Sequence, residues 1–286
     1  MSNQLRETSI EEALKIKEQV QSLVDESVNA NAGHPLSIEI MDSKTTDSMN
    51  FNIPGLPKPP FRMLMNAQSN SGKTNLLMNL LSKRMYGGYF PTIHVFSNSL
   101  ATDIGMWSNL PDERLRNCHD HYDEKKLAEI FDEQEQLVAM QFNGVKCKQN
   151  AVLVVCDDVI EDLFHFGSGP KHIADHLAIR GRHVNISFII ISQQYKLLPK
   201  TLRINCSAMI LFELHNRREL KDVFEEHCGQ FTAKRFEALT RHIWSLPYQF
   251  LFIDYTLPNV IRFRKNLTRA VVDEEMMQHM NMGKGI

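Results

Sequence analysis

The chain has 286 residues, of which 43% are hydrophobic and 23% are charged. These values are ordinary for a globular protein and exclude a largely disordered or fibrous chain, and the length suits one α/β domain with appendages. The formal net charge of −2 argues against a surface coated in positive charge, although it leaves room for local basic loops.

No apolar run approaches the roughly 20 residues that would span a bilayer. The first 30 residues also lack the basic and then apolar layout of a secretory signal. We therefore expect a soluble intracellular protein with no membrane partner. The five cysteines are odd in number and show no C-x-x-C spacing, which argues against a disulfide framework or a zinc site.

The first predicted helix covers residues 10–28, where apolar side chains recur at helical spacing. A stretch containing Gly33 and Pro35 ends it, and residues 54–60 are rich in proline. We expect residues 1–60 to form an N-terminal helix and linker segment, residues 61–265 to form the main domain, and residues 266–286 to form a C-terminal tail.

Strand and helix patterns alternate along the main domain. Strands are predicted at residues 61–66, 93–97, 152–156, 186–191, 208–212 and 249–253. Helices are predicted at residues 73–85, 125–141, 170–179 and 219–243, the last with a break near Gly229. Several strands are almost continuously apolar, as parallel strands covered on both faces require. The prediction is a three-layer α/β domain with a mostly parallel sheet.

Residues 67–74 have the spacing of a Walker A motif, with Ala67 in place of the usual first glycine. A predicted strand precedes the motif and a helix follows it, which is the context of a P-loop. Backbone N–H groups and the helix dipole favour phosphate there. Lys73 would contact the β and γ phosphates of a nucleoside triphosphate, and the Thr74 hydroxyl would bind Mg²⁺. The expected nucleotide-binding residues are Gln68, Ser69, Asn70, Ser71, Gly72, Lys73, Thr74 and Asn75.

Two carboxylates follow the apolar strand at residues 152–156. Asp157 fits the Walker B role of holding Mg²⁺, and Asp158 lies next along the chain, where a base could polarise an attacking water. The alternative is a solvated turn after a buried strand. The upstream P-loop favours the magnesium site.

Gln193 follows the strand at residues 186–191, at an edge where ligands bind in open α/β folds. It could sense the γ-phosphate, or it could solvate a turn. Arg182 and Arg203 flank the same strand and could stabilise transition-state charge, although arginines are more often surface ion-pair residues. The histidine pairs at positions 119 and 121 and at positions 172 and 176 have no third ligand at a suitable spacing, so we do not expect a metal there.

These motifs, taken in their order along the chain, resemble those of a known protein family. The segments at residues 70–74, 155–158, 182–187, 192–194 and 198–205 together resemble the genome-packaging ATPases of poxviruses, other large eukaryotic DNA viruses, virophages and related transposons, which belong to the FtsK/HerA superfamily. The resemblance runs from about Phe61 to about Phe263. Residues 1–60 match nothing in the family pattern, and Ala67 departs from it.

The resemblance implies a RecA/FtsK-like P-loop NTPase fold and a role for each matching residue. Lys73 and Thr74 would bind ATP and Mg²⁺, and Asp157 would bind the metal. Asp158 would be the acidic catalytic partner and Gln193 the polar sensor. Either Arg182 or Arg203 would be the arginine finger.

The resemblance also implies partners and a location. ATP hydrolysis would drive double-stranded DNA into a preformed capsid, through a pentameric or hexameric ring docked on a capsid or portal vertex. The site of action would be a viral factory in the host cytoplasm or nucleus, or the virion. Candidate DNA-contacting segments are residues 164–172 and 196–200. Two alternatives stay open, namely a P-loop ATPase or kinase with a non-DNA substrate and a nucleotide-binding virion assembly protein.

Overall fold

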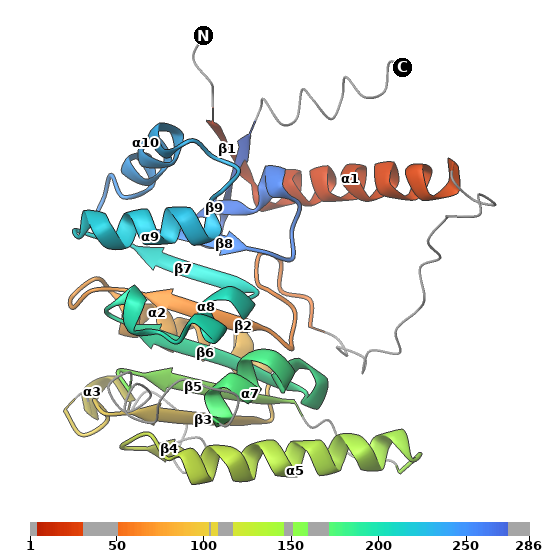
Figure 1. Ribbon diagram of the computed structural model, residues 1–286, viewed down its shortest axis with the longest axis vertical. Helices are drawn as coiled ribbons and strands as arrows, with labels where there is room; N and C mark the ends of the chain where they lie inside the picture. Colours follow the sequence, from red (N-terminus) through yellow and green to blue (C-terminus); the bar gives the residue numbers. More distant parts are fainter. Residues whose placement is uncertain are drawn as a thin grey trace.

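The computed structural model describes residues 5–30, 51–102, 104–107, 117–145, 151–159 and 172–273. A single sheet of ten strands runs through these residues (Figure 1). From one edge to the other, the strands are β1 (Leu5–Ser9), β10 (Arg269–Asp273), β9 (Phe263–Lys265), β8 (Phe250–Asp254), β7 (Ala208–Phe212), β2 (Arg62–Asn66), β6 (Ile186–Ser192), β5 (Val152–Asp157), β3 (Thr92–Ser97) and β4 (Cys118–His119).

The sheet has a parallel half and an antiparallel extension. Strands β7, β2, β6, β5, β3 and β4 pair in parallel, whereas β8, β9, β10 and β1 add to β7 in antiparallel fashion. Every residue of β5, β6 and β7 is buried, which explains their continuous apolar sequence. The six strands predicted from the sequence are all present.

Helices cover both faces of the parallel half and create two hydrophobic cores. One face carries α2 (Lys73–Leu80), the 3₁₀ helix η1 (Tyr86–Gly88) and α3 (Ile104–Trp107). The other face carries α5 (Glu124–Phe142), α7 (Ile173–Arg180), η2 (Gly181–Val184), η3 (Tyr195–Leu197), α8 (Lys200–Asn205), α9 (Arg217–His227) and α10 (Ala233–Ile243). The predicted three-layer α/β architecture is therefore confirmed.

Helix α2 ends at Leu80, earlier than the predicted limit at residue 85. The chain folds back on the end of the helix, since a Cβ atom on Gly87 would lie 1.9 Å from the carbonyl oxygen of Leu81. Tyr86 is fully buried and stacks on Phe51 with a centroid distance of 5.2 Å. Tertiary packing therefore replaces the last helical turn with η1.

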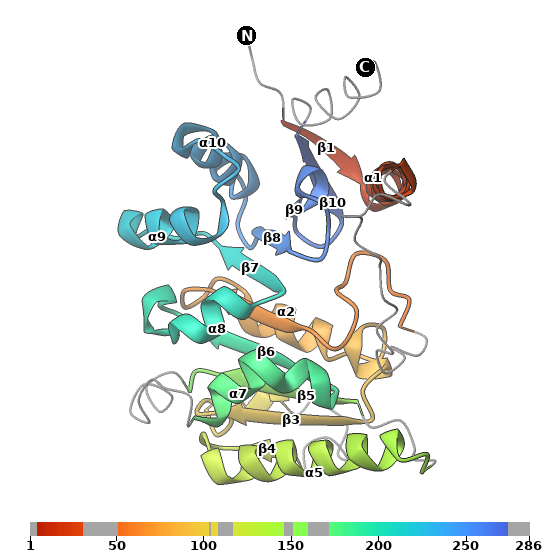
Figure 2. The ribbon, with the colours of Figure 1, turned by 45° about the vertical axis from the view of Figure 1, so that its right-hand side comes forward.

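The antiparallel extension brings the two ends of the described chain together. Strand β1 pairs with β10, so that Leu5 lies opposite Asp273. Helix α1 (Ile10–Ala30) follows β1 and packs Ala13 and Ile16 against η4 (Asn259–Ile261) and β10. Figure 2 shows α1 beside β1 and β10, at the other end of the sheet from α5. The sheet thus extends beyond residues 61–265 on both sides, through strands that have short and partly polar sequences.

A buried ion pair lies in this extension. Arg264 on β9 donates to the Asp254 carboxylate at the end of β8, with an Nη2–Oδ2 distance of 2.7 Å, and both side chains are at most 4% exposed. Arg264 also donates to the carbonyl oxygen of Gly55. Burial lowers the pKa of the Arg264 guanidinium, and the Asp254 charge opposes that shift. The pair therefore ties β8 and β9 to the segment that leads into β2.

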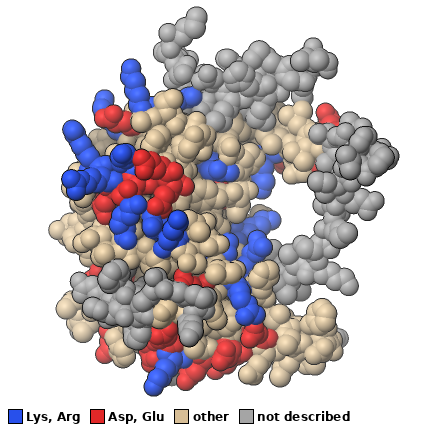
Figure 3. Space-filling model, viewed as in Figure 1, with Lys and Arg blue, Asp and Glu red and all other residues tan. Residues whose placement is uncertain are grey.

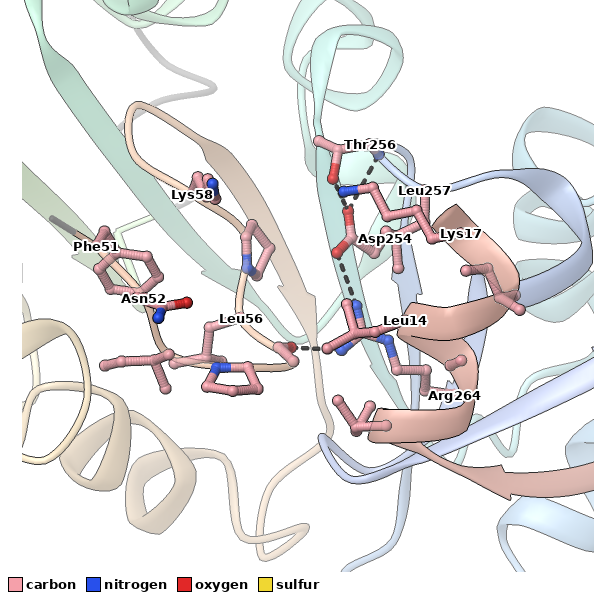
Figure 4. Close-up of a pocket in the computed structure, with 17 residues that line it drawn as sticks. Leu14, Lys17, Phe51, Asn52, Leu56, Lys58, Asp254, Thr256, Leu257 and Arg264 are labelled. Carbon is pink, nitrogen blue, oxygen red and sulfur yellow. Dashed lines mark hydrogen bonds and ion pairs between the residues drawn. The ribbon is translucent and has the colours of Figure 1, made fainter. Parts of the chain in front are cut away.

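The same residues line a cavity of about 310 Å³, bounded by α1, residues 51–58 and the end of β8 (Figure 4). Because β8 runs antiparallel to β7, its end lies at the amino edge of the parallel strands. The P-loop follows the carboxyl end of β2, so this cavity is at the opposite edge from the predicted nucleotide site. No helix within the described ranges is both long and apolar enough to cross a membrane.

Candidate nucleotide site

The loop from Ala67 to Gly72 connects β2 to α2. Asn70 and Gly72 both have positive φ angles, of 61° and 93°, and Gly72 is the N-cap of the helix. Asparagine and glycine tolerate this conformation better than other residues do. Ala67 is fully buried and belongs to the same hydrophobic core as α2, so the methyl group that replaces the expected glycine is accommodated by packing.

The start of α2 leaves hydrogen-bond donors for a ligand. The first backbone hydrogen bond of the helix runs from the N–H group of Leu76 to the carbonyl oxygen of Gly72, at 3.0 Å. The preceding N–H groups of Lys73 and Thr74 have no partner within the helix. The Ser71 hydroxyl oxygen is buried and has no hydrogen-bond partner among the described residues. These donors fit the phosphate groups of a nucleotide.

Asp157 ends β5 on the face of the sheet that carries α2. Side chains alternate along a strand, and Val155, two residues earlier, packs in the core that includes α2. The Asp157 side chain is 2% exposed and accepts a hydrogen bond from the Ser97 hydroxyl at 3.5 Å. Asp157 and Thr74, at the start of α2, are the residues that would hold Mg²⁺. A carboxylate and a hydroxyl are suitable ligands for that ion.

Asp158, Gln193 and Ser69 form a chain of hydrogen bonds across the edge of the sheet. The Gln193 amide nitrogen donates to the Asp158 carboxylate at 3.1 Å, and the Ser69 hydroxyl donates to the Gln193 amide oxygen at 3.1 Å. Strand register brings them together, because Asn66 pairs with Ser192 and Asp157 pairs with Ile191. The structure thus joins the P-loop, the second carboxylate and the candidate sensor.

Asn98 is a further residue of this edge, and no sequence motif pointed to it. Its side-chain amide donates to the backbone carbonyl of Asp158 at 3.1 Å. Asp158 has a φ angle of 57°, which turns it out of the strand, and its side chain is exposed. Asn98 follows the end of β3, so a search for polar residues after every predicted strand would have found it.

Arg182 lies far from the P-loop of its own chain. It belongs to η2, immediately before β6, and is exposed. Burial lowers the pKa of Arg62, and the nearby positive charge of Arg182 lowers it further. Because Arg62 begins β2, this proximity places Arg182 at the amino edge of the parallel strands, opposite the nucleotide site.

Arg203 is engaged inside the fold. It is 8% exposed, donates through Nε to the carbonyl oxygen of Leu198 at 3.1 Å, and pairs with Glu226. Its guanidinium also lies over the Tyr195 ring, 5.0 Å from the ring centroid. Tyr195 in turn donates to Glu226 at 2.6 Å. A residue held by this many contacts is poorly placed to reach a neighbouring nucleotide, so the arginine-finger hypothesis rests on Arg182.

The candidate DNA-contacting segments are only partly visible. Residues 164–171 lie outside the described residues. Lys196 pairs with Asp222 at 3.1 Å and with Glu226 at 3.3 Å, whereas Lys200 is exposed. On the face drawn in Figure 3, acidic and basic side chains lie side by side over α9. Within the described ranges, no group of three or more His, Cys, Asp or Glu residues could hold a metal ion.

Comparison with known proteins agrees with this architecture. A family model for the poxvirus A32 protein matches residues 48–224. No curated protein matches the sequence. Among solved structures, the genome-packaging NTPase B204 of Sulfolobus turreted icosahedral virus 2, solved with AMP, superposes with a TM-score of 0.50 at 12% identity, over 76% of this chain and 98% of that one.

Two further structures are similar at lower scores. The DNA-packaging ATPase B204 of Sulfolobus turreted icosahedral virus gives a TM-score of 0.43 at 18% identity, over 69% of this chain and 94% of that one. The second and third ATPase domains of EssC from Geobacillus thermodenitrificans give 0.45 at 16% identity, over 75% and 39%.

The family match covers more than half of the chain and includes all the motif residues that carry the expected resemblance up to Asn205. The likeness to B204 at a TM-score of 0.50 independently supports the P-loop NTPase fold. The chain therefore belongs to the poxvirus A32 protein family.

Proposed function

We propose that this chain hydrolyses ATP at the P-loop edge and uses the energy to move double-stranded DNA into a viral capsid. The observation that carries the catalytic part is the hydrogen-bonded chain from Ser69 through Gln193 to Asp158. It supports a direct connection between the P-loop, which would bind the phosphates, and the Asp158 carboxylate, which would activate the attacking water.

The roles of the residues follow from their positions. Lys73 neutralises charge on the β and γ phosphates, and the backbone donors at the start of α2 bind phosphate oxygens. Asp158 accepts a proton from the attacking water, and Gln193 holds the Asp158 carboxylate in position. Thr74 and Asp157 would hold Mg²⁺, which would supply charge stabilisation for the transferred phosphoryl group.

The DNA-moving part of the proposal rests on family membership. A motor that must move any sequence needs contacts to the DNA backbone rather than to base edges, and several subunits can share those contacts. The net charge of −2, with acidic and basic side chains mixed on the face drawn in Figure 3, suits a subunit that binds DNA weakly alone and more strongly in a ring. The ring would dock on a capsid or portal vertex, and its site of action would be a viral factory or the virion.

ATP turnover with and without double-stranded DNA, measured across a salt series, tests this proposal. We expect DNA to stimulate turnover, and we expect the stimulation to fall steeply as salt rises, because phosphate contacts release counterions. Stimulation by a protein or a small phosphoryl acceptor, with none by DNA, would favour a different substrate. Nucleotide binding without turnover would favour an assembly protein.

The position of Arg182 leads to a proposal about the ring. Since Arg182 lies at the edge opposite its own P-loop, a neighbouring subunit's nucleotide is its natural target in a closed head-to-tail ring. Lys73→Ala and Arg182→Ala subunits should each be nearly inactive. Mixing them creates interfaces in which an intact P-loop faces an intact arginine, so activity should return. If subunits demonstrably exchange and no activity returns, Arg182 is not the finger.

A further inference from the structure

An exposed tyrosine lies against the P-loop, outside every motif found in the sequence. Tyr248 belongs to the loop between α10 and β8 and is 72% exposed. Strand β8 runs antiparallel to β7, and Phe250 pairs with Phe212, the last residue of β7. The loop that contains Tyr248 therefore reaches the carboxyl edge of the parallel strands, where the P-loop also lies.

The Tyr248 ring lies beside Gly72, the N-cap of α2. A Cβ atom built on Gly72 would lie 3.2 Å from Cδ1 of Tyr248 and 3.8 Å from its Cγ. Tyr248 also has a φ angle of 63°, which costs free energy for a bulky residue and persists only where surrounding structure holds it. The ring therefore lies beside the P-loop on one side and is open to solvent elsewhere.

Both ends of the loop are anchored. The Trp244 indole N–H donates to the carbonyl oxygen of Leu211 in β7 at 3.3 Å. Phe250 packs on Phe212 with a ring-centroid distance of 5.2 Å, and its backbone N–H donates to Asn266 at 3.1 Å. These contacts hold both ends of the loop in place, which keeps Tyr248 beside the P-loop.

The order of the strands suggests which way a bound nucleotide would point. Asp158 and Gln193, which handle the reacting end of the nucleotide in the proposed function, follow β5 and β6 on one side of β2. The other neighbour of β2 is β7, with β8 beyond it. A nucleotide whose γ-phosphate lies toward Asp158 would extend its base toward β7 and β8, which is the side where Tyr248 lies beside Gly72.

We propose that Tyr248 forms the nucleobase subsite of this chain, with the base stacked on the open face of the phenol ring. This inference rests on the proposed function. An aromatic ring is a good platform for any base, because every base has a π-face, and stacking discriminates little between adenine and guanine. The ring, rather than the hydroxyl group, carries the interaction.

Binding of two ligands, with and without a base, tests the proposal. The dissociation constants of ATP and of inorganic tripolyphosphate, each with Mg²⁺, are measured by calorimetry for wild type, Tyr248→Ala and Tyr248→Phe. We expect Tyr248→Ala to weaken ATP binding about tenfold, which is about 1.4 kcal/mol, and Tyr248→Phe to retain it. Tripolyphosphate should bind all three proteins equally. Leu246→Ala, an exposed change in the same loop, is the matched control and should leave both affinities unchanged.

Three outcomes would overturn the inference. Equal weakening of ATP and tripolyphosphate by Tyr248→Ala would mean that the ring supports the P-loop itself. Unchanged ATP affinity would mean that the base lies elsewhere. If light scattering shows that Tyr248→Ala changes the oligomeric state and that ATP affinity follows it, the ring is a subunit contact. Failure of the wild-type chain to bind either ligand would refute the proposed function itself, which distinguishes the two failures.

Discussion

The two halves of the sheet are built in different ways. At the carboxyl edge of the parallel half, Ser69, Gln193 and Asp158 meet through hydrogen bonds between solvent-accessible side chains. In the antiparallel extension, Arg264 and Asp254 pair where almost no solvent reaches them, and α1 covers the outer strands. The hydrogen bonds at the carboxyl edge can rearrange when a ligand binds. The buried pair in the antiparallel extension instead stabilises the fold. Substitutions in the two regions should therefore separate chemistry from stability.

Lys73→Ala should have the largest effect on ATP affinity, and it should leave stability unchanged. Removing the charge that neutralises the β and γ phosphates should reduce ATP affinity by at least about 100-fold. The free energy of unfolding should stay within about 0.5 kcal/mol of wild type, because Lys73 is a half-buried residue at a helix start. Lys83→Ala, an exposed change just beyond α2, is the control. Wild-type ATP affinity in Lys73→Ala would contradict the P-loop assignment.

Asp158→Asn should slow ATP hydrolysis strongly while keeping ATP binding. An amide accepts a proton poorly but preserves shape, so ATP turnover should fall by about 10² to 10³ and ATP affinity should stay close to wild type. Single-turnover kinetics would separate the two quantities. Gln193→Ala should give a smaller loss, because it removes only the group that positions the carboxylate. Normal turnover in Asp158→Asn would mean that the base is elsewhere.

Arg264→Met should lower stability without changing ATP affinity. It leaves the Asp254 carboxylate buried without its partner, which should lower the free energy of unfolding by about 3–5 kcal/mol. ATP affinity, measured well below the unfolding midpoint, should not change. Arg269→Met, which removes an exposed arginine near Glu7, should cost less than about 1 kcal/mol. A loss of ATP affinity in folded Arg264→Met would show that the buried ion pair, and not only the loop with Tyr248, affects nucleotide binding.

His227→Gln should sharpen the comparison through pH, since it tests a half-buried polar group on α9, beside the parallel half. Burial lowers the pKa of His227 to about 4. The unfolded chain has a histidine pKa of about 6.5, so it binds more protons between pH 6.5 and 4, and stability falls as pH falls through that window.

His227→Gln removes that proton uptake and should recover about 2 kcal/mol of the acid-induced loss. Denaturant unfolding at pH 7 and pH 4.5 measures it. His183→Gln, at an exposed histidine, is the matched control substitution. An identical pH dependence in His227→Gln and wild type would show that His227 is protonated as easily in the folded chain as in the unfolded one.

The parallel half could be predicted from the sequence because its strands and motifs are each formed by residues that are close together in the chain. Candidate site residues follow β2, β5 and β6 directly, so Lys73, Asp157 and Gln193 could be placed at one edge from the strand pattern alone. The hydrogen bond from Ser69 to Gln193 could not be predicted, because it joins positions 124 residues apart. The same limit hid the pairing of β1 with β10. Tyr248 was missed because it follows no motif and reaches the P-loop only through the turn before β8.

The claim that ATP hydrolysis moves double-stranded DNA is tested most directly by displacement of a third strand. A labelled oligonucleotide bound as a triplex to linear duplex DNA is released when a translocase reaches it. We expect release by the wild-type chain with ATP and Mg²⁺, and none with a non-hydrolysable ATP analogue or with Asp158→Asn. DNA-stimulated ATP turnover that leaves the triplex in place would contradict translocation.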